Sequence, residues 1–515
     1  MDRSKSLKKI TKKKIWDLII IGGGSSGLGI AVDSASRGYK TLLIEKYDFS
    51  KGTSSRSTKL VHGGVRYLQN GDISLVVEAL RERGIMRKNA PHLVRDLSFV
   101  IPSYDWWNSP FYGIGLKIYD MMSGKLGLGP STLLSRDEII KLIPNVKKNG
   151  LKGGVIYHDG QFDDARMAIS LAQTAENHGA TLINYFGVEE LIKEKEMICG
   201  IIARDYIENK SYKIMSKGVI NATGVFSDSI TNLDIKKRNK TIVPSQGVHI
   251  VLNKSFLASN HAIMVPHTTD GRVLFVVPWN NYVIVGTTDT QIKKIDIEPK
   301  PLKKEVEFIL KNAGTYMKSA PTFSDIKSIF AGLRPLAAPE KNEKATKEIS
   351  RHHKVTVSTS GLISILGGKW TTYRKMAEDT VNTARSVAGL QDRECITHNL
   401  TIHGYDYSSN WKNPIHFYGT DIEKIENLDS KGNSSISKKF FISKNQIIWS
   451  IRNEMAMNLE DVMARRTRSL FLDAKESLRI APIVIEIMAK EMKKNSNWIK
   501  NEIANFEKLA KNYKM

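Results

Sequence analysis

Residues 16–46 constrain the fold more than any other stretch, because strand and helix patterns alternate there around three spaced glycines. Residues 17–21 form a short apolar run, which is typical of a strand buried on both faces of a parallel sheet. Gly22, Gly24 and Gly27 follow with the spacing G-x-G-x-x-G. This spacing predicts a tight turn that leads into a helix whose N-terminus can hold a phosphate group.

The second half of the stretch completes this unit. Ser26 lies in the first turn of the predicted helix, Gly38 ends the helix, and residues 41–44 form a second apolar strand. Glu45 follows about 20 residues beyond the glycines, where a carboxylate accepts hydrogen bonds from the ribose of an adenine dinucleotide. Strand, glycines, helix and acid together therefore predict a dinucleotide-binding unit.

The length and composition of the chain exclude several classes of protein. A chain of 515 residues is too long for one hydrophobic core and predicts two or three domains. No run reaches the ~20 apolar residues of a membrane-spanning helix. Residues 3–14 are basic, without the apolar core of a secretory signal, and we expect no amphipathic apolar face in them. Only Cys199 and Cys395 occur, so we expect a cytoplasmic protein with neither a disulfide framework nor a metal site.

The formal net charge of +24 suits three kinds of partner: a nucleic acid, an anionic membrane surface or a small anionic molecule. Lysines are scattered through every segment, which also suits a merely solvated surface. A nucleic-acid-binding protein would show a concentrated basic stripe with interleaved aromatic residues. We therefore predict no nucleic-acid partner.

The rest of the chain alternates between helix and strand patterns. An amphipathic pattern predicts a helix over residues 73–89, and Asp163 is placed to cap another over residues 164–178. Residues 241–290 contain several short strands in hairpin-like succession, which predicts an antiparallel sheet inserted in an α/β chain. Beyond residue 390 the pattern is mostly helical.

Four further segments are more specific than the glycine spacing. They are TSSRSTKLVHGGVRYL at 53–68, AGLRPL at 331–336, GGKWTTYRKMAE at 367–378 and EDVMARRTRSLFLD at 460–473. Together with the glycine unit, they resemble FAD-dependent glycerol-3-phosphate dehydrogenases of the aerobic, quinone-linked type. The chain departs from this family at Ser25-Ser26 and at Trp370, and it lacks the long insertion of oxygen-using glycerophosphate oxidases, which favours a dehydrogenase.

The resemblance implies an α/β fold in three parts: a Rossmann-like FAD-binding domain, an inserted antiparallel-sheet substrate domain and a C-terminal helical cap domain. The first comprises residues 15–95, 150–240 and 355–390, the second residues 96–149 and 241–354, and the third residues 391–515. Whether the cap domain attaches to a membrane, forms a homodimer or only covers the flavin domain stays open.

A bound flavin would need positively charged contacts, because its reduced ring is best stabilised as an anion near N1. Gly367 and Gly368 would let backbone N–H groups approach the ring, the helix beginning near Thr371 would direct its dipole there, and Lys369 adds a charge. A plain turn into a helix would also suit this GGK sequence. The remaining predicted cofactor contacts are Ser54, Ser55, Thr58, Lys59, His62, Gly63, Gly64, Ala222, Thr223 and Gly224.

The substrate of this family is a phosphomonoester with a charge of about −1.5 to −2, which guanidinium forks bind in bidentate fashion. Arg66 and Arg334 are the first predicted ligands, because both lie in apolar or glycine-rich surroundings. The supporting donors are Tyr67, Lys369 and Tyr373, and the weaker candidates are Arg351 and Arg374.

Removal of the substrate's hydroxyl proton requires a base with a pKa near neutral pH, which points to histidine. His62 and His249 lie in the motifs, and we prefer His62 because a histidine on an apolar strand also suits a core position. The resemblance implies oxidation of sn-glycerol 3-phosphate to dihydroxyacetone phosphate, with hydride transfer to flavin N5 and electrons passed to a quinone at the inner face of the cytoplasmic membrane. The alternative is an FAD oxidase or 2-hydroxyacid dehydrogenase of the same fold.

Overall fold

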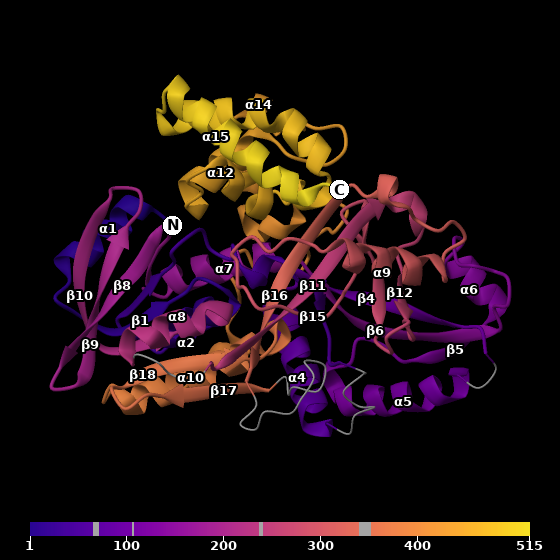
Figure 1. The fold of residues 1–515 in the computed structure, drawn as a ribbon, viewed down its shortest axis with the longest axis horizontal. Coiled ribbons are helices and arrows are strands. Elements are labelled where there is room, and N and C mark those ends of the chain that lie inside the picture. Colours follow the sequence, from indigo (N-terminus) through magenta and orange to yellow (C-terminus); the bar gives the residue numbers. More distant parts are fainter. Residues whose placement is uncertain (65–71, 106–107, 236–239, 339–351) are drawn as a thin grey trace.

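The computed structural model describes residues 1–64, 72–105, 108–235, 240–338 and 352–515. Two sheets and a C-terminal group of helices make up this part of the chain (Figure 1). The predicted ligands Arg66, Tyr67 and Arg351 lie outside the described residues.

The first sheet contains the predicted dinucleotide unit. Its main path runs in the order β17-β18-β10-β1-β2-β7, and β8 and β9 extend it from β10. Strand β1 pairs in parallel with both β2 and β10, as a buried α/β sheet requires. The strands are β1 (Ile15–Ile21), β2 (Thr41–Ile44), β7 (Thr181–Ile183), β8 (Phe186–Glu194), β9 (Met197–Asp205), β10 (Lys210–Asn221), β17 (His353–Val357) and β18 (Leu362–Gly367).

Alternate side chains of β1 lie on opposite faces of this sheet. Leu18 and Ile20 pack against three helices, whereas Ile19 and Ile21 pack on the other face with Ile10. The three helices are α2 (Ser25–Ser36), α7 (Asp164–Asn177) and α10 (Tyr373–Val387). Asp163 caps α7 as predicted, because its carboxylate accepts hydrogen bonds from the first free backbone N–H groups of the helix.

The N-terminal segment corrects one expectation. Residues Arg3–Lys12 form helix α1, and this helix has an apolar face although the sequence indicated none. Leu7 and Ile10 are one helical turn apart and pack into the core beside the first sheet. Arg3 pairs with the Asp205 carboxylate at 2.8 Å. The basic segment is therefore docked on the protein, and its lysines surround a short apolar stripe.

The second sheet is largely antiparallel, as predicted for residues 241–290. Its main path runs β15-β11-β14-β13-β12-β4-β6-β3, with β16 paired to β11 and β5 paired to β6. Strands β3 and β6 come from ranges that the sequence assigned to the FAD-binding domain, so the chain passes between the sheets more often than that division implies. The strands are β3 (Leu60–Val61), β4 (Val94–Ser103), β5 (Thr132–Ser135), β6 (Gly153–Phe162), β11 (Ile242–Asn253), β12 (Ala262–Val265), β13 (Leu274–Trp279), β14 (Tyr282–Gly286), β15 (Thr290–Gln291) and β16 (Ser328–Ala337).

Helices cover the margins of the second sheet. The predicted helix over residues 73–89 is confirmed with those bounds. It packs against α5 at the lower edge of the molecule in Figure 1, and α9 packs on β11. These helices are α4 (Ile73–Asn89), α5 (Asn108–Ser123), α6 (Arg136–Leu142) and α9 (Lys303–Gly314), and α8 (Ser227–Asp234) follows β10.

The last part of the chain is helical, as predicted. Phe471, Ile480 and Val484 form a core with Phe330 of β16, so this domain is anchored on the second sheet. It lies above both sheets in Figure 1. Its helices are α11 (Ile422–Glu426), α12 (Lys444–Glu454), α13 (Ser469–Leu472), α14 (Ala474–Met492) and α15 (Ser496–Ala510).

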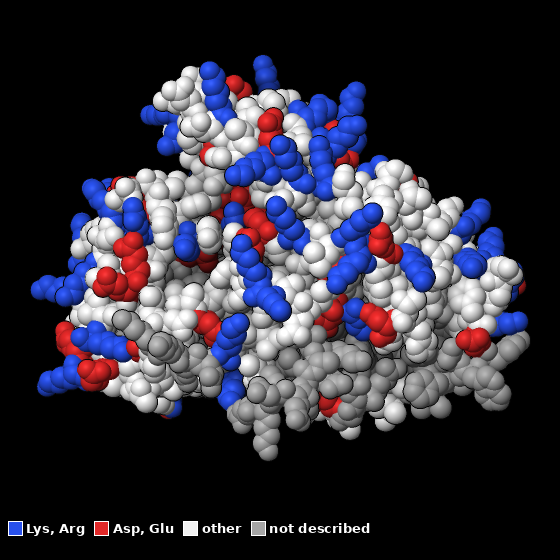
Figure 2. All heavy atoms as spheres, viewed as in Figure 1, with Lys and Arg blue, Asp and Glu red and all other residues white. Residues whose placement is uncertain are grey.

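Lysine and arginine side chains are spread over the face shown in Figure 2, and no basic stripe crosses it. Among the described residues, no helix combines the length and the apolar character needed to cross a bilayer.

Candidate active site

The glycine turn after β1 has the geometry of a phosphate-binding turn. Gly22 has φ +111°, and a Cβ on Gly27 would lie 1.9 Å from the Gly22 carbonyl oxygen, so close packing requires both glycines. Gly24 is the N-cap of α2, and no side chain caps that helix from this position. The first turn of α2 therefore presents backbone N–H donors and the positive end of its dipole, which fits the pyrophosphate of a dinucleotide.

The predicted turn at residues 222–224 lies against this glycine turn. The Ala222 backbone N–H donates to the Ile21 carbonyl at 2.9 Å, and a Cβ on Gly22 would lie 2.7 Å from the Ala222 carbonyl oxygen. Thr223 donates its hydroxyl to the buried Asn221 side chain at 2.7 Å. Gly224 has φ +58°. The three small residues thus bring two strand ends together at the predicted cofactor site.

Glu45 is half-buried at the end of β2, and the loss of solvent around its carboxyl raises the pKa of that group. One carboxylate oxygen accepts the Gly23 backbone N–H at 2.6 Å, and the other accepts the Tyr47 N–H at 2.8 Å. Glu45 therefore stabilises the glycine turn itself. Its contact with the ribose stays a prediction.

Residues 48–59, which we term the bridging loop, connect the glycine turn to the other cofactor motifs. The Ser50 backbone N–H donates to the Gly23 carbonyl at 2.9 Å, and the Ser54 hydroxyl accepts the Ser25 N–H at the start of α2 at 2.9 Å. From the opposite side, the Trp370 indole N–H donates to the Ser54 carbonyl at 2.8 Å. One loop therefore contacts both ends of the predicted FAD site.

Two predicted residues of this loop have other partners. The Ser55 hydroxyl contacts the Gly52 carbonyl. Lys59 is fully buried, and its ammonium group lies 2.6 Å from the Asp164 carboxylate and 2.8 Å from the Ser55 carbonyl. Burial lowers the pKa of Lys59 to about 7, and the Asp164 charge opposes that shift. The Lys59 side chain stabilises the bridging loop through these two contacts and does not line the cavity described below.

A cavity of about 210 Å³ lies where the bridging loop, the second sheet and the segment after β18 meet. It brings together seven predicted residues from four separate segments of the chain. They are Thr58, His62, His249, Arg334, Gly368, Lys369 and Thr371.

His249 and Arg334 supply the polar chemistry of the second sheet. The Nε2 atom of His249 lies 2.8 Å from the Thr58 hydroxyl, and its ring stacks on Phe330. Burial lowers the pKa of His249 well below its ordinary value, and the Lys59 and Arg334 charges act in the same direction, so the imidazole is neutral at neutral pH. Arg334 donates to the Thr287 hydroxyl at 3.1 Å and keeps a partly exposed side chain.

Local sequence makes room for these groups. A Cβ on Gly247 would lie 2.5 Å from an Arg334 guanidinium nitrogen. His62 and Thr371 contact each other through backbone and hydroxyl groups at 3.3 and 3.4 Å, so the HGG and GGK motifs meet. The Gly63 N–H donates to the Tyr119 hydroxyl at 2.8 Å.

Three glycines of these two motifs are required by the backbone. Gly64, Gly367 and Gly368 have φ values of +82°, +73° and +83°, in the left-handed region that other residues rarely adopt. A Cβ on Gly368 would also lie 2.3 Å from the Met376 sulfur atom. The GGK segment is therefore a constrained turn at the cavity wall.

Comparisons with known proteins agree with this geometry. The family described as FAD dependent oxidoreductase matches residues 17–374, and the C-terminal domain of alpha-glycerophosphate oxidase matches residues 363–498. A probable mitochondrial glycerol-3-phosphate dehydrogenase of Dictyostelium discoideum is 38% identical over 96% of this chain and 84% of its own length. The mitochondrial glycerol-3-phosphate dehydrogenase of Mesocricetus auratus is 36% identical over 95% of this chain and 72% of its own. This chain belongs to the glycerol-3-phosphate dehydrogenase family of FAD-dependent oxidoreductases.

One solved structure agrees with this family, and a second, 17% identical, shares only the fold. The Bacillus halodurans glycerol-3-phosphate dehydrogenase, solved with FAD, has a TM-score of 0.81 and 27% identity over 99% of this chain and 97% of its own. The Mycoplasma pneumoniae L-alpha-glycerophosphate oxidase shares the fold, with a TM-score of 0.57 over 75% of this chain and 98% of its own. FAD is the cofactor of this oxidoreductase, and the glycine turn, the turn at residues 222–224 and the GGK turn fit it. In the part of the chain that the structure describes, no group of three His, Cys, Asp or Glu side chains could hold a metal ion.

Two predicted substrate ligands lie away from the cavity of this glycerol-3-phosphate dehydrogenase family member. Tyr373 is buried between α10 and α2, where a Cβ on Gly29 would lie 2.8 Å from its ring. Arg374 pairs with the Glu82 and Glu378 carboxylates at 2.6 and 2.7 Å. Both side chains hold helices together, because α10 turns them toward its neighbours.

The sequence did not single out several residues that line the cavity. Arg56 is buried and pairs with Glu298 at 2.7 Å, and Phe275 of β13 contributes an aromatic ring. Trp370 lines the cavity as well, although it is a position at which the chain departs from the family motif. The hydroxyl-rich motif around Arg56 was the available signal for that residue. The sequence offered no such signal for Phe275, because an aromatic residue on a strand is also typical of a hydrophobic core.

Proposed function

We propose that this FAD-dependent enzyme oxidises sn-glycerol 3-phosphate to dihydroxyacetone phosphate and passes the electrons to a quinone. The observation that carries the proposal is the shared cavity of Arg334, Lys369 and the neutral His249 beside the GGK turn. Bound FAD supplies the hydride acceptor at flavin N5. The curated relatives that match nearly the whole chain are named for this substrate.

Arg334 and Lys369 are the proposed ligands of the substrate phosphate. They come from β16 and from the loop after β18, so a dianion between them is held by two independent elements. A guanidinium fork suits phosphate oxygens, and an ammonium group adds a point charge. Two cations favour a dianionic substrate over an amino acid, which needs a clamp for only one carboxylate.

His249 is the proposed acceptor of the proton from the substrate C2 hydroxyl. Its imidazole is neutral, and the Thr58 hydroxyl at 2.8 Å holds the ring in place. This choice differs from the sequence preference for His62, because the His249 ring is held at the cavity wall by the Thr58 hydroxyl and by stacking on Phe330. Its lowered pKa leaves it unprotonated and able to accept the proton, but makes it a weaker base than an ordinary imidazole. His62 lines the same cavity and is the alternative.

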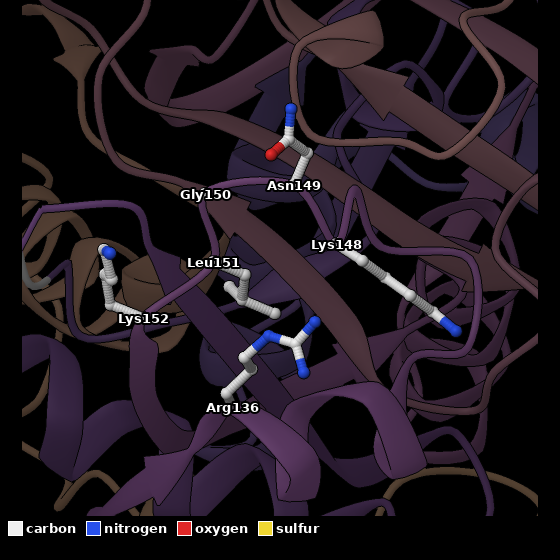
Figure 3. A pocket seen from close by; sticks show the side chains of 6 residues that line it. All are labelled: Arg136, Lys148, Asn149, Gly150, Leu151 and Lys152. Carbon is white, nitrogen blue, oxygen red and sulfur yellow. The ribbon is translucent and has the colours of Figure 1, made fainter.

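We also propose that the enzyme meets its quinone at the inner face of the cytoplasmic membrane. Exposed apolar side chains occur on the adjacent helices α4 and α5 and on β5: Ile73, Val77, Ile118, Met121 and Leu133. Beyond β5, an open basic pocket is lined by Arg136, Lys148 and Lys152 (Figure 3). Apolar side chains near basic ones suit the surface of an anionic bilayer.

Anaerobic reduction of the yellow holoenzyme tests substrate and acceptor together. We expect glycerol 3-phosphate to bleach the flavin absorbance, and lactate, 2-hydroxyglutarate and D-alanine to leave it unchanged. A quinone analogue should then restore the colour faster than oxygen does. Bleaching by lactate or D-alanine alone would refute glycerol 3-phosphate as the substrate. Faster recovery of the flavin absorbance with oxygen would favour an oxidase.

A further inference from the structure

Three arginines of the C-terminal domain reach out of that domain toward the cofactor site. Arg465, Arg466 and Arg468, here termed the arginine clamp, lie in and directly after the π-helix Asp461–Arg466. Their side chains are at most 2% exposed. Buried guanidinium groups are costly unless they are paired and hydrogen-bonded, so their partners identify what they hold.

The first partner lies at the start of the bridging loop. Arg466 donates two hydrogen bonds to the Asp48 carboxylate, at 2.6 and 2.8 Å, and Arg465 adds a third to the same group. Burial alone would raise the pKa of Asp48, but the two guanidinium charges outweigh burial and lower it to about 2. Asp48 is therefore ionised at neutral pH and ties the loop to the C-terminal domain.

The second partner lies in the middle of the same loop. Arg468 donates to the Ser55 carbonyl at 2.8 Å and to the Asp164 carboxylate at 3.0 Å. Lys59 binds this carbonyl and this carboxylate from the loop side. Arg468 thus completes a buried polar group that spans the bridging loop, α7 and the C-terminal domain.

A third contact lies at the less buried edge. The Lys51 ammonium group pairs with the Glu460 carboxylate at 2.7 Å, directly before the π-helix. The C-terminal domain therefore contacts the bridging loop at Asp48, Lys51 and Ser55.

Backbone conformation shows that the bridging loop needs such support. Ser50, Lys59 and Arg468 are non-glycine residues with φ values of +65°, +63° and +61°. Left-handed backbone at such residues is unfavourable and persists where surrounding contacts determine it. Two of these residues belong to the loop, and the third is the clamp residue that bonds to its centre.

The supported loop is the one that contacts both cofactor motifs, through Ser50 at the glycine turn and Ser54 at the start of α2 and at Trp370. We propose that the arginine clamp is a set of positioning residues through which the C-terminal domain holds the bridging loop over FAD and so retains the cofactor. The inference rests on the assignment of this loop to the FAD site. It is independent of the substrate.

Arg468→Lys tests the clamp, because lysine keeps the charge but has only one nitrogen and cannot bond to the Ala464 carbonyl with one nitrogen and to Ser55 and Asp164 with another, as Arg468 does. We expect FAD to leave the diluted holoenzyme about tenfold faster, since a hydrogen bond from a charged group is lost from the loop. Flavin fluorescence follows release, and circular dichroism follows unfolding separately. Amide hydrogen exchange at residues 48–59 should accelerate in the yellow variant. Arg479→Lys is the matched control, because Arg479 pairs with Glu476 on an exposed face of the same domain.

Unchanged FAD release and unchanged exchange in Arg468→Lys would overturn the proposal. Equal acceleration in Arg479→Lys would also overturn it, because the effect would then be general. If Arg468→Lys does not fold, Lys51→Gln tests the proposal at the contact between Lys51 and Glu460. FAD release that is about threefold faster supports the clamp, and unchanged FAD release refutes it. A colourless wild-type protein would refute the cofactor assignment itself, which is distinguishable from yellow protein with unchanged release.

Discussion

Arg334 in the cavity and the arginine clamp differ in what surrounds their guanidinium groups. The Arg334 side chain is 22% exposed, and it contacts the Thr287 hydroxyl with the Asp289 carboxylate 3.9 Å away. Arg466 is 0% exposed and forms two short bonds to one carboxylate. Both are arginines in family motifs, but only Arg334 keeps solvent access.

The difference shows that the surroundings of an arginine decide whether it stabilises the fold or faces the cavity. A buried cation must be neutralised by fixed carboxylates, because desolvation otherwise costs several kcal/mol. A cation that binds a mobile anion must instead remain accessible from the cavity, as the partly exposed Arg334 side chain is. Stability should therefore depend on the clamp, and turnover on Arg334.

The largest effect is expected at the centre of the clamp. Asp48→Ala removes the carboxylate shared by Arg465 and Arg466 and leaves two buried cations without it, which should lower the free energy of unfolding by ~3–5 kcal/mol. Urea titration followed by circular dichroism measures this loss. Asp137→Ala is the control, because its pair with Arg136 is exposed and should contribute less than about 1 kcal/mol. Similar losses in both variants would contradict the comparison.

A smaller effect of a different kind is expected in the cavity. Arg334→Ala should lower kcat/KM for glycerol 3-phosphate by roughly 10–100-fold, or ~1.5–3 kcal/mol, because charge-assisted bonds to the phosphate are lost. Its free energy of unfolding should change by less than about 1 kcal/mol. Arg272→Ala, in the loop before β13 and paired with Asp270, should leave kcat/KM unchanged. An unchanged kcat/KM in Arg334→Ala would refute the assignment of Arg334 as a ligand of the substrate phosphate.

The smallest effect concerns pH. Burial beside Lys59 and Arg334 lowers the pKa of His249 well below 6.5, so the proposed base is already unprotonated at pH 6.5. Raising the pH from there to about 8 should change kcat/KM by less than about twofold, and the acid limb should lie lower. His249→Asn should slow turnover across this range. An acid limb near pH 6.5 that disappears in His62→Asn would assign the base to His62.

Local patterns predicted the regular elements well. Residues 41–44 and 73–89 are a strand and a helix with the expected bounds, because apolar periodicity and turn residues act over short distances. The same reasoning missed α1, whose apolar stripe of Leu7 and Ile10 is short and surrounded by lysines. That helix is held by the first sheet, which the local sequence does not contain.

The candidate site was predicted in part. The motifs identified Arg334, His249 and Lys369, and folding brings them to one cavity. They also suggested Lys59 and Tyr373, whose side chains are turned away from it. A motif locates a backbone segment, whereas the direction of each side chain depends on which neighbours fill the space beside it.

The sequence by itself determined the dinucleotide unit, because the glycine spacing, helix start and acid of residues 16–46 act through local backbone geometry. Only the tertiary structure decided which cations hold the protein and which face the cavity. Arg465 and Asp48 are 417 residues apart in the chain, and folding places them in one buried ion pair. Burial is a property of that packing, and it separates the clamp from the partly exposed Arg334.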